Sequence, residues 1–374
     1  MVSYLLSVLK GLPVSPPKAS QEQWPQFFSV LVPHWILPLL YWQIRSLPEE
    51  CHPPKNVMDQ MRQVFLLNSV RAFHLETQIR EALTAFEKEA VRILVLKGPA
   101  LGRSVYPDPA TREGSDLDLL VLPGQMIRAR RILENLGYLC QDRRFEVSRD
   151  FYCEEKFVPP GNAGGKRLIE LHWDLHRFSG IRREAGIEEL FTNAVRISHS
   201  ALAFEALHPV DALIHRSLNN AFIHDQDMRL SWIYDVVLLA RSLRVPEDWE
   251  VLQQRSVDWR ARLALEHSLT LARIWGGLEL PPAYADFSTW PRPTKTEIDG
   301  WYKATRRHER LSEYLSLHMS HASGRLEKLR FFIHLLFPSP DYMRVKYPPS
   351  KDGLLFLSYV RRWRRWLSRL LPAG

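Results

Sequence analysis

The sequence has few cysteines and no long apolar run. Three cysteines, Cys51, Cys140 and Cys153, occur in 374 residues, an odd number at spacings without a pattern. We therefore expect reduced thiols and a cytoplasmic protein. The most apolar stretches, such as residues 331–337, fall far short of the roughly 20 residues that a membrane-spanning helix needs. A spanning segment is excluded on this ground.

We expect no targeting signal, no phosphate-binding loop and no internal repeats in this sequence. Residues 1–13 have no basic leading region and no small-residue cleavage site, so we expect a short amphipathic helix there. Residues 98–104 superficially resemble a phosphate-binding loop. That loop has four residues between its glycines and a lysine before Ser or Thr, whereas this segment has three residues and Arg103. The phosphate-loop interpretation is rejected.

The composition is that of a globular protein with an excess of positive charge. Hydrophobic residues make up 45% and charged residues 25% of the chain, and 374 residues can bury a sizeable core in two packed units. The formal net charge of +8 favours anionic partners such as a nucleoside triphosphate, RNA or an anionic membrane. RNA binding rests on this charge alone, and it predicts a steep loss of affinity with salt.

Two aspartates, Asp116 and Asp118, lie on one face of a predicted strand. Apolar residues at the odd positions of 117–121 alternate with them, which is the period of a β-strand. The two Cα atoms are then about 6.6 Å apart, so both carboxylates can reach one Mg²⁺ or bridge two ions. An apolar run over residues 91–96 that stops at Gly98 predicts a preceding strand and turn. A solvated strand face is the alternative for such a pair.

A second alternating segment, residues 167–176, offers a third carboxylate. Its odd positions are apolar, and its even positions share one face. Glu170 is the first choice for the site and Asp174 the second, although a solvated strand edge shows the same alternation. His172 and His176 are alternative zinc ligands, but the recurring zinc spacings are absent, so we expect them to line the site or to be buried.

The residues that lead into the aspartate strand occur in the order of a known family; they are Leu96, Lys97, Gly98, Arg112, Asp116 and Asp118. This segment resembles the nucleotidyltransferase superfamily of the DNA polymerase beta fold, most closely its bacterial "uncharacterised nucleotidyltransferase" family. There a hydrophobic residue and a Gly-Gly or Gly-Ser turn precede an Asp-x-Asp strand, and a later strand adds a carboxylate. The resemblance covers residues 85–180. Pro99 departs from it, because proline removes a hydroxyl and a backbone N–H from the turn.

The resemblance implies an α+β fold, with a DNA polymerase beta-like mixed-sheet unit and a flanking, mainly helical domain. It implies Mg²⁺-dependent transfer of a nucleoside monophosphate from a triphosphate to a hydroxyl or similar acceptor, with two metal ions offsetting phosphate charge. The implied catalytic residues and metal ligands are Asp116, Asp118 and Glu170. The implied nucleotide contacts are Lys97, Gly98, Arg112 and Ser115.

The acceptor stays open between a small molecule, a peptide or protein, an envelope precursor and RNA. A second hypothesis is a catalytically inactive nucleotide-binding or scaffold protein of a biosynthetic assembly, associated with a membrane. Pro99 and the basic C-terminal segment favour this hypothesis. Three convergent carboxylates oppose it, because their repulsion costs stability when no cation is bound.

The C-terminal segment, residues 354–370, combines tryptophans with arginines. On a helix Trp363, Trp366 and Leu370 cluster on one side, and three arginines flank them. One interpretation is peripheral contact with the inner face of a membrane, with tryptophans at headgroup depth and arginines on anionic lipid. The other is a terminal helix docked on the body of the protein, whose arginine stems cover apolar surface.

Periodicity and breaks predict three parts: an N-terminal helical segment over 1–88, the catalytic unit over 89–200 and a helical domain over 201–374. Residues 57–88 form a long amphipathic helix, or two helices, whose apolar positions are Leu66, Leu67, Val70, Phe73 and Leu83. The catalytic unit has predicted strands at 91–96, 116–121, 144–158 and 167–175 and a predicted helix at 125–136.

Three polar residues, His215, Arg229 and Asp235, lie within apolar helical segments of the third part. A polar group in such a place usually has a partner. We expect Arg229 and Asp235 to form an ion pair between two helices, in preference to binding substrate.

Overall fold

The structure is a computed structural model. It describes residues 1–15, 19–20, 22–114, 116–148, 152–159, 161, 167–176, 186–200, 202–222, 228–305 and 355–367, with isolated positions between 326 and 347. The helices are α1 (Val2–Lys10), α2 (Gln23–Leu31), α3 (Leu37–Ile44), α4 (Lys55–Lys88), α5 (Lys97–Ser104), α6 (Met126–Asn135), α7 (Arg144–Ser148), α8 (Ile187–Thr192), α9 (Pro209–Phe222), α10 (Leu230–Ser242), α11 (Pro246–Asp258), α12 (Arg262–Gly276), α13 (Lys295–Thr305) and α17 (Leu355–Leu367).

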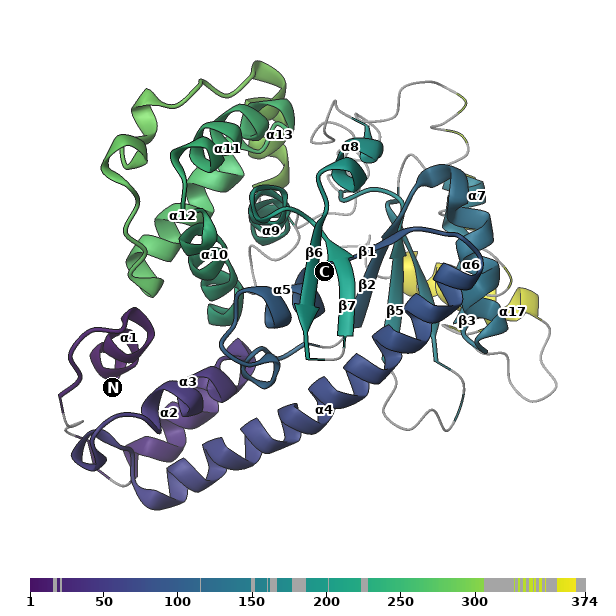
Figure 1. Ribbon diagram of the computed structural model, residues 1–374. Helices are drawn as coiled ribbons and strands as arrows, with labels where there is room; N and C mark the ends of the chain where they lie inside the picture. The colour runs from purple at the N-terminus through teal and green to yellow at the C-terminus, as the bar shows by residue number, and fades with distance from the viewer. Residues whose placement is uncertain are drawn as a thin grey trace.

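A seven-stranded mixed sheet forms the centre of the fold (Figure 1). Its strands are β1 (Ile93–Val95), β2 (Asp116–Val121), β3 (Leu139–Cys140), β4 (Glu154–Val158), β5 (Leu168–His172), β6 (Val195–His199) and β7 (Leu202–Ala206). The order is β3-β4-β5-β2-β1-β7-β6, with β2 parallel to β5, β1 parallel to β7, and the other neighbours antiparallel. A mixed sheet with flanking helices confirms the predicted α+β class.

One face of the sheet packs against α4 and α6. The odd residues of β2, from Leu117 to Val121, are buried together with Ile79 and Phe86 of α4 and Leu133 of α6. Figure 1 shows α4 running diagonally past the lower ends of β7 and β2 toward α6. The odd positions of β2 and β5 are buried in this apolar layer. The even positions, which carry the acidic residues, therefore face the other side.

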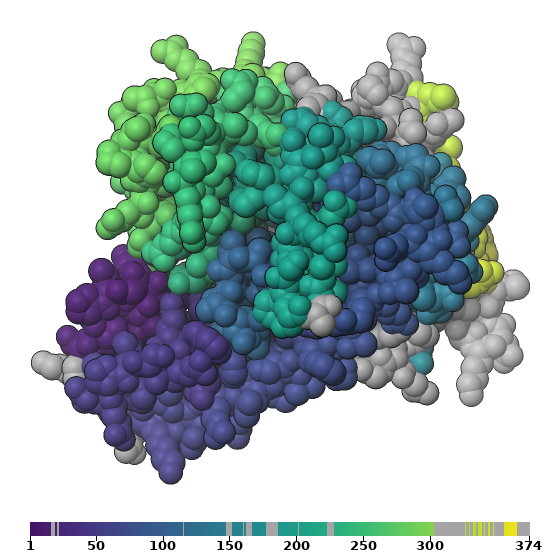
Figure 2. Space-filling model, in the orientation of Figure 1, coloured from purple at the N-terminus to yellow at the C-terminus, as the bar shows by residue number. Residues whose placement is uncertain are grey.

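The opposite face of the sheet packs against the helical remainder of the chain. Leu94 and Leu120 join one apolar core with residues of α1, α3, α9, α10 and α12. Figure 2 shows the N-terminal helices, in purple, and the green helices of the α9–α13 region in contact with the sheet unit along one side of the molecule. The polar residues of β2 and β5 thus lie between the sheet and α9, where water is scarce.

The predicted elements of the catalytic unit are mostly present. The strand at 116–121 is β2, and the helix at 125–136 is α6 with ends shifted by one residue. The predicted strand at 144–158 is wrong in its first part, because Arg144–Ser148 is helical. Arg130 binds the buried Glu155 through two hydrogen bonds of 2.9 and 2.7 Å, and the same carboxylate accepts the backbone N–H of Phe145 at the start of α7. That interaction favours a helical turn.

The sheet continues past residue 200, the predicted limit of the catalytic unit. Strands β6 and β7 form an antiparallel hairpin, and Ala206 of β7 pairs with Val95 of β1. The limit between the second and third parts stays a prediction, and it falls inside this hairpin.

The long helix predicted over 57–88 is α4, a single helix of 34 residues. Four of its five predicted apolar positions, Leu66, Leu67, Val70 and Phe73, are exposed by 50% to 68%. The buried apolar residues of α4 lie toward its two ends, from Val57 to Met61 against the N-terminal helices and from Leu75 to Phe86 against the sheet. The middle of the helix bridges the two regions.

Helix α17 begins at Leu355 and contacts the segment that precedes it. The indole N–H of Trp363 donates to the carbonyl of Leu336 at 2.7 Å, and its ring packs edge-on against Phe337. Trp366 has no described side chain, and Leu370 lies outside the described residues. Within the described part of the chain, every helix is too short or too polar to cross a bilayer. Peripheral membrane contact stays a prediction.

Candidate active site

Strand register brings the predicted carboxylates together. Asp118 of β2 lies directly opposite Glu170 of the parallel strand β5, and His172 follows two residues later on the same face. Strand β4 pairs with the other edge of β5 and adds Glu154, opposite His172, and Lys156, opposite Glu170. With Lys97 these residues form what we term the carboxylate cluster: Lys97, Asp118, Glu154, Lys156, Glu170 and His172.

Asp118 is 2% exposed and lies between two cationic groups. Its Oδ1 is 2.7 Å from Nζ of Lys97 and 3.0 Å from Nε2 of His172. Burial alone would raise the pKa of Asp118, but these two neighbours outweigh it and hold the pKa well below its usual range. Asp118 is therefore ionised at every physiological pH.

Glu170 has the opposite electrostatic setting. Burial, Glu154 and Asp118 raise its pKa to about 7, although Lys97 and His172 favour the charged form. Lys156 forms an ion pair with one carboxylate oxygen, and Lys97 lies 4.0 Å from the other. Glu170 thus changes charge near neutrality, next to a carboxylate that does not.

The donor set fits a divalent cation. Ligand atoms of Asp118, Glu170 and His172 all lie within 4.8 Å of one another. Burial and Lys97 oppose a charge on His172, yet Asp118, Cys153 and Glu154 raise its pKa to about 10. The cluster therefore attracts positive charge strongly, and Lys97, Lys156 and His172 provide that charge in this structure. Hard cations prefer oxygen ligands of this kind.

The other predicted acidic residues lie near this group but outside it. Asp116 is on the same face of β2, partly exposed, and Asp174 lies just beyond β5, where its Oδ1 accepts the N–H of Leu175 at 2.7 Å. Among the described residues, two groups have mutually close ligand atoms; one of them contains Glu170, and neither contains Asp116 or Asp174. Ser115 lies outside the described residues.

The turn that carries Lys97 is fixed by a backbone contact. The N–H of Leu96 donates to the carbonyl of Asp118 at 2.9 Å, and Lys97 follows with a φ of 47°, in the left-handed region that non-glycine residues rarely adopt. This conformation directs the chain from β1 into α5 at the level of Asp118.

Arg112 lies beneath this turn, paired with a carboxylate. Its Nη2 is 2.9 Å and its Nε 3.3 Å from the two oxygens of Asp235 in α10, and its side chain is 6% exposed. A Cβ at Gly98 would lie 2.5 Å from Nη1 of Arg112, so the absence of a side chain at residue 98 lets the turn rest on the guanidinium. The predicted phosphate contacts of Arg112 and Gly98 stay predictions.

Asp235 has further partners, and together they form the Asp235 cluster: Tyr106, Arg112, Arg216 and Asp235. The hydroxyl of Tyr106 donates to Oδ1 at 2.8 Å, and Nε of Arg216 lies 3.6 Å from Oδ2. Arg229 does not take the predicted place; its guanidinium stacks over Trp35 and Trp232, with 3.6 and 4.7 Å to the ring centroids. The Asp235 cluster joins the loop after α5 to α9 and α10.

Several groups near the turn were missed by the sequence analysis. Glu154 and Lys156 alternate with buried Glu155 and Phe157, a period that was readable in β4. Arg71 and Arg167 line a narrow basic cleft beside Gly98 and Gly114, and Nη1 of Arg167 donates to the carbonyl of Gly114 at 2.6 Å. Arg71 and Arg167 are distant from the aspartates in sequence, so no local motif links them to the site.

A cavity of about 140 Å³ opens on the other side of Lys97, between α5, the β6–β7 hairpin, α9 and α10. It is mainly apolar, with Leu96, Leu101 and Ile197 in its wall, and His215 contributes a polar group. Nε2 of His215 is buried and has no hydrogen-bond partner in the described part of the chain. Burial, Lys97 and His172 keep the pKa of His215 well below its usual value, so its ring is neutral.

The chain matches the model of a known protein family. Residues 20–277 match the family described as "Uncharacterised nucleotidyltransferase", and the chain belongs to that family. It is therefore an enzyme of the nucleotidyl-transferring class, which uses a nucleoside triphosphate and in general a divalent metal. The predicted family is confirmed.

Two other comparisons add less. No curated protein matches the chain. Among solved structures, the solution structure of the antibiotic-resistance factor ANT(2'')-Ia is similar, with a TM-score of 0.37 and 18% sequence identity, over 52% of this chain and 97% of that chain.

Proposed function

We propose that this enzyme moves a nucleoside monophosphate group from a triphosphate to an acceptor hydroxyl in a Mg²⁺-dependent reaction. The observation that supports this proposal is the register of β2 and β5, which sets Asp118 against Glu170 with His172 beside them. Family membership gives the reaction class. The metal, its ligands and the acceptor belong to the proposal.

Asp118 and Glu170 would hold the metal, with Asp116 from the more open end of the same strand face. The bound ion would offset charge on the phosphate oxygens and lower the pKa of an acceptor hydroxyl. His172 orients Asp118 through the contact at 3.0 Å. Burial of Asp118 and Glu170 at 2% and 7% exposure strengthens every charge interaction at this point.

The lysines have a defined part in this proposal. Lys97 and Lys156 neutralise Asp118 and Glu170 in this structure, and a metal ion would compete with them for the carboxylates. A Lys97 ammonium released from Asp118 would lie at the start of α5, where backbone N–H groups and positive charge favour phosphate. Arg71 and Arg167 would extend the positive surface for the triphosphate.

The test is transfer from α-labelled nucleoside triphosphates to components of a cell extract, with wild type and Asp118→Asn in parallel. We expect label on an extract component only with the wild type and only with Mg²⁺. The chemical nature of the labelled component gives the acceptor class. Nucleotide binding that is equal in both proteins and gains nothing from Mg²⁺, with no labelled product, would instead establish the inactive scaffold.

A further inference from the structure

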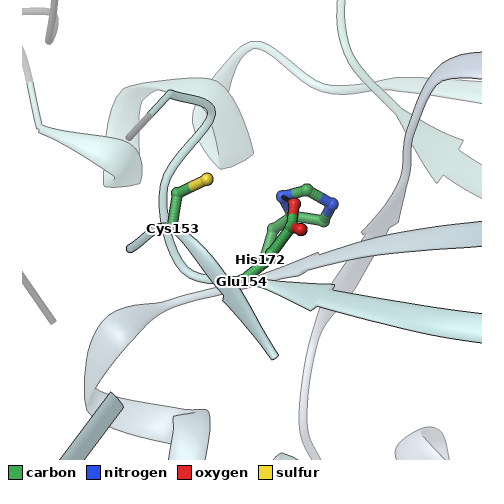
Figure 3. A group of neighbouring side chains, drawn as sticks. All are labelled: Cys153, Glu154 and His172. Atoms are coloured by element: carbon green, nitrogen blue, oxygen red, sulfur yellow. Dashed lines mark ion pairs between the residues drawn. The ribbon is translucent and has the colours of Figure 1, made fainter. Parts of the chain in front are cut away.

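We propose that Cys153, Glu154 and His172 form a second metal site, selective for Zn²⁺, beside the carboxylates assigned to Mg²⁺. Figure 3 shows the thiol, the carboxylate and the imidazole directed toward the same space from the adjoining ends of β4 and β5. The site shares Glu154 and His172 with the carboxylate cluster, but its existence does not depend on the proposed nucleotidyl transfer.

The distances suit a small tetrahedral ion. One ligand atom from each of the three residues lies within 4.8 Å of the other two, and Nδ1 of His172 is 3.7 Å from Oε2 of Glu154. Zinc bonds of about 2.0–2.3 Å place neighbouring tetrahedral ligands roughly 3.3–3.8 Å apart. A contraction of at most about 1 Å completes this geometry, and a change of the Cys153 rotamer can provide it.

An unsatisfied atom points to a ligand at this position. Nδ1 of His172 is buried and makes no hydrogen bond of ordinary length in the described part of the chain, where its polar neighbours are Oε2 of Glu154 at 3.7 Å and the Cys153 thiol, and the residue is 1% exposed. A buried polar atom without a partner costs about 1–3 kcal/mol, so its presence requires an explanation. A metal ion at Nδ1 satisfies that atom.

The other nitrogen of the ring has the contact typical of a zinc-binding histidine. Nε2 of His172 lies 3.0 Å from Oδ1 of Asp118. Metal-bound histidines usually donate their second N–H to a carboxylate, which fixes the tautomer and the ring orientation. Asp118 would thus orient the zinc ligand with one oxygen and keep the other available for Mg²⁺.

Ligand chemistry separates the two ions. Thiolate and imidazole select zinc over magnesium, whereas carboxylate oxygens suit magnesium. Zinc binding converts the Cys153 thiol to thiolate and removes the proton from Nδ1 of His172, and both protons go to solvent. Three protein ligands leave the fourth position for water or an incoming group.

The experiment uses the full chain, freed of metal with a chelator and titrated with Zn²⁺ and with Co²⁺ as a coloured probe. We expect one equivalent of tight binding and a thiolate-to-cobalt charge-transfer band in the wild type. In Cys153→Ser the band disappears, and Zn²⁺ affinity falls by about 100-fold or more. Cys51→Ser is the matched control, since the buried Cys51 donates to the Val14 carbonyl at 3.2 Å and a hydroxyl keeps that bond.

Two spectra distinguish a missing zinc ligand from a variant that fails to fold. The wild-type spectrum needs no variant, so the absence of a charge-transfer band at saturating Co²⁺ overturns the proposal even where Cys153→Ser fails to fold. Glu170→Gln, which removes only a ligand assigned to Mg²⁺, keeps the band if the two sites are distinct. Loss of the band in Glu170→Gln with normal folding also overturns the proposal, because Glu170 would then belong to the thiolate site.

Discussion

Two buried clusters of charge lie on the same side of the sheet, and they are built differently. In the Asp235 cluster one carboxylate has two guanidinium partners and a tyrosine hydroxyl. The carboxylate cluster holds three acidic side chains against two lysines and a histidine, and one acid, Glu170, has a pKa near 7. The first cluster has fixed partners, and the second is arranged to exchange its cations. We infer that the first maintains the fold and the second carries the chemistry.

Removing the charge of Asp235 should have the largest effect on stability. Asp235→Asn leaves Arg112 and Arg216 buried without a counter-charge, and loss of one partner of a buried pair costs about 3–5 kcal/mol. Denaturant unfolding followed by circular dichroism measures this change. An unfolding free energy within about 1 kcal/mol of wild type would show that the Asp235 cluster does not maintain the fold.

Glu170→Gln should instead damage function and spare the fold. We expect transfer to fall by about 10²–10³-fold, the loss that follows removal of one electrostatic stabiliser. Because burial and the two neighbouring carboxylates disfavour the charge of Glu170, the metal-free variant should be as stable as wild type, or more stable, at pH 8. The matched control is Asp174→Asn on the same segment, which should transfer near the wild-type rate. A larger loss in Asp174→Asn would assign the third carboxylate to Asp174.

The pH dependence of stability tests the charge state of Glu170 in the carboxylate cluster. Folding raises the pKa of Glu170 from 4.5 to about 7, so between these values the folded state holds a proton that the unfolded state has lost. The unfolding free energy of the metal-free protein should therefore fall as pH rises through this range, by at most about 3 kcal/mol from this group.

Glu297, whose pKa burial also raises to about 7, contributes a similar slope. Saturating Mg²⁺ and Glu170→Gln should each remove only the part that belongs to Glu170. Stability measured against pH with and without Mg²⁺ gives both parts. A slope that Mg²⁺ leaves unchanged would show that Glu170 does not bind the ion.

The smallest expected effects on stability are those of alanine substitutions at two glycines of α5. In Gly98→Ala the new Cβ meets Nη1 of Arg112 at 2.5 Å, so the guanidinium must move, at about 1–3 kcal/mol. In Gly102→Ala the nearest atom is 3.7 Å away, and the helix should gain about 0.5–1 kcal/mol. Equal thermal unfolding of the two variants would argue against a tight contact between the turn and Arg112.

The periodicity of the sequence correctly predicted elements whose structure depends on neighbouring residues. The alternation in 116–121 gave β2 with its acidic and apolar faces, and the long periodic segment gave α4. The helical turn at 144–148 was missed because it depends on Glu155, a residue of the next strand that binds both Arg130 and the start of α7. Tertiary contact overrode the local period there.

The sequence predicted only those site residues that lie on the two strands in which polar and apolar residues alternate. Family resemblance and period together gave Asp118 and Glu170, which register then placed side by side. The partner of Arg112 is more than a hundred residues away, so no spacing indicates Asp235. The middle of α4 is a similar case. The helical period predicts an apolar face there, but it does not say which residues pack against that face, and the face is exposed.

The most direct measurement of the central claim is Mn²⁺ binding followed by electron paramagnetic resonance, in wild type, Asp118→Asn and Glu170→Gln. We expect that the wild type binds Mn²⁺, that nucleoside triphosphate tightens this binding, and that both variants lose it while staying folded. Equal Mn²⁺ affinity in all three folded proteins would mean that the carboxylates of β2 and β5 hold no metal.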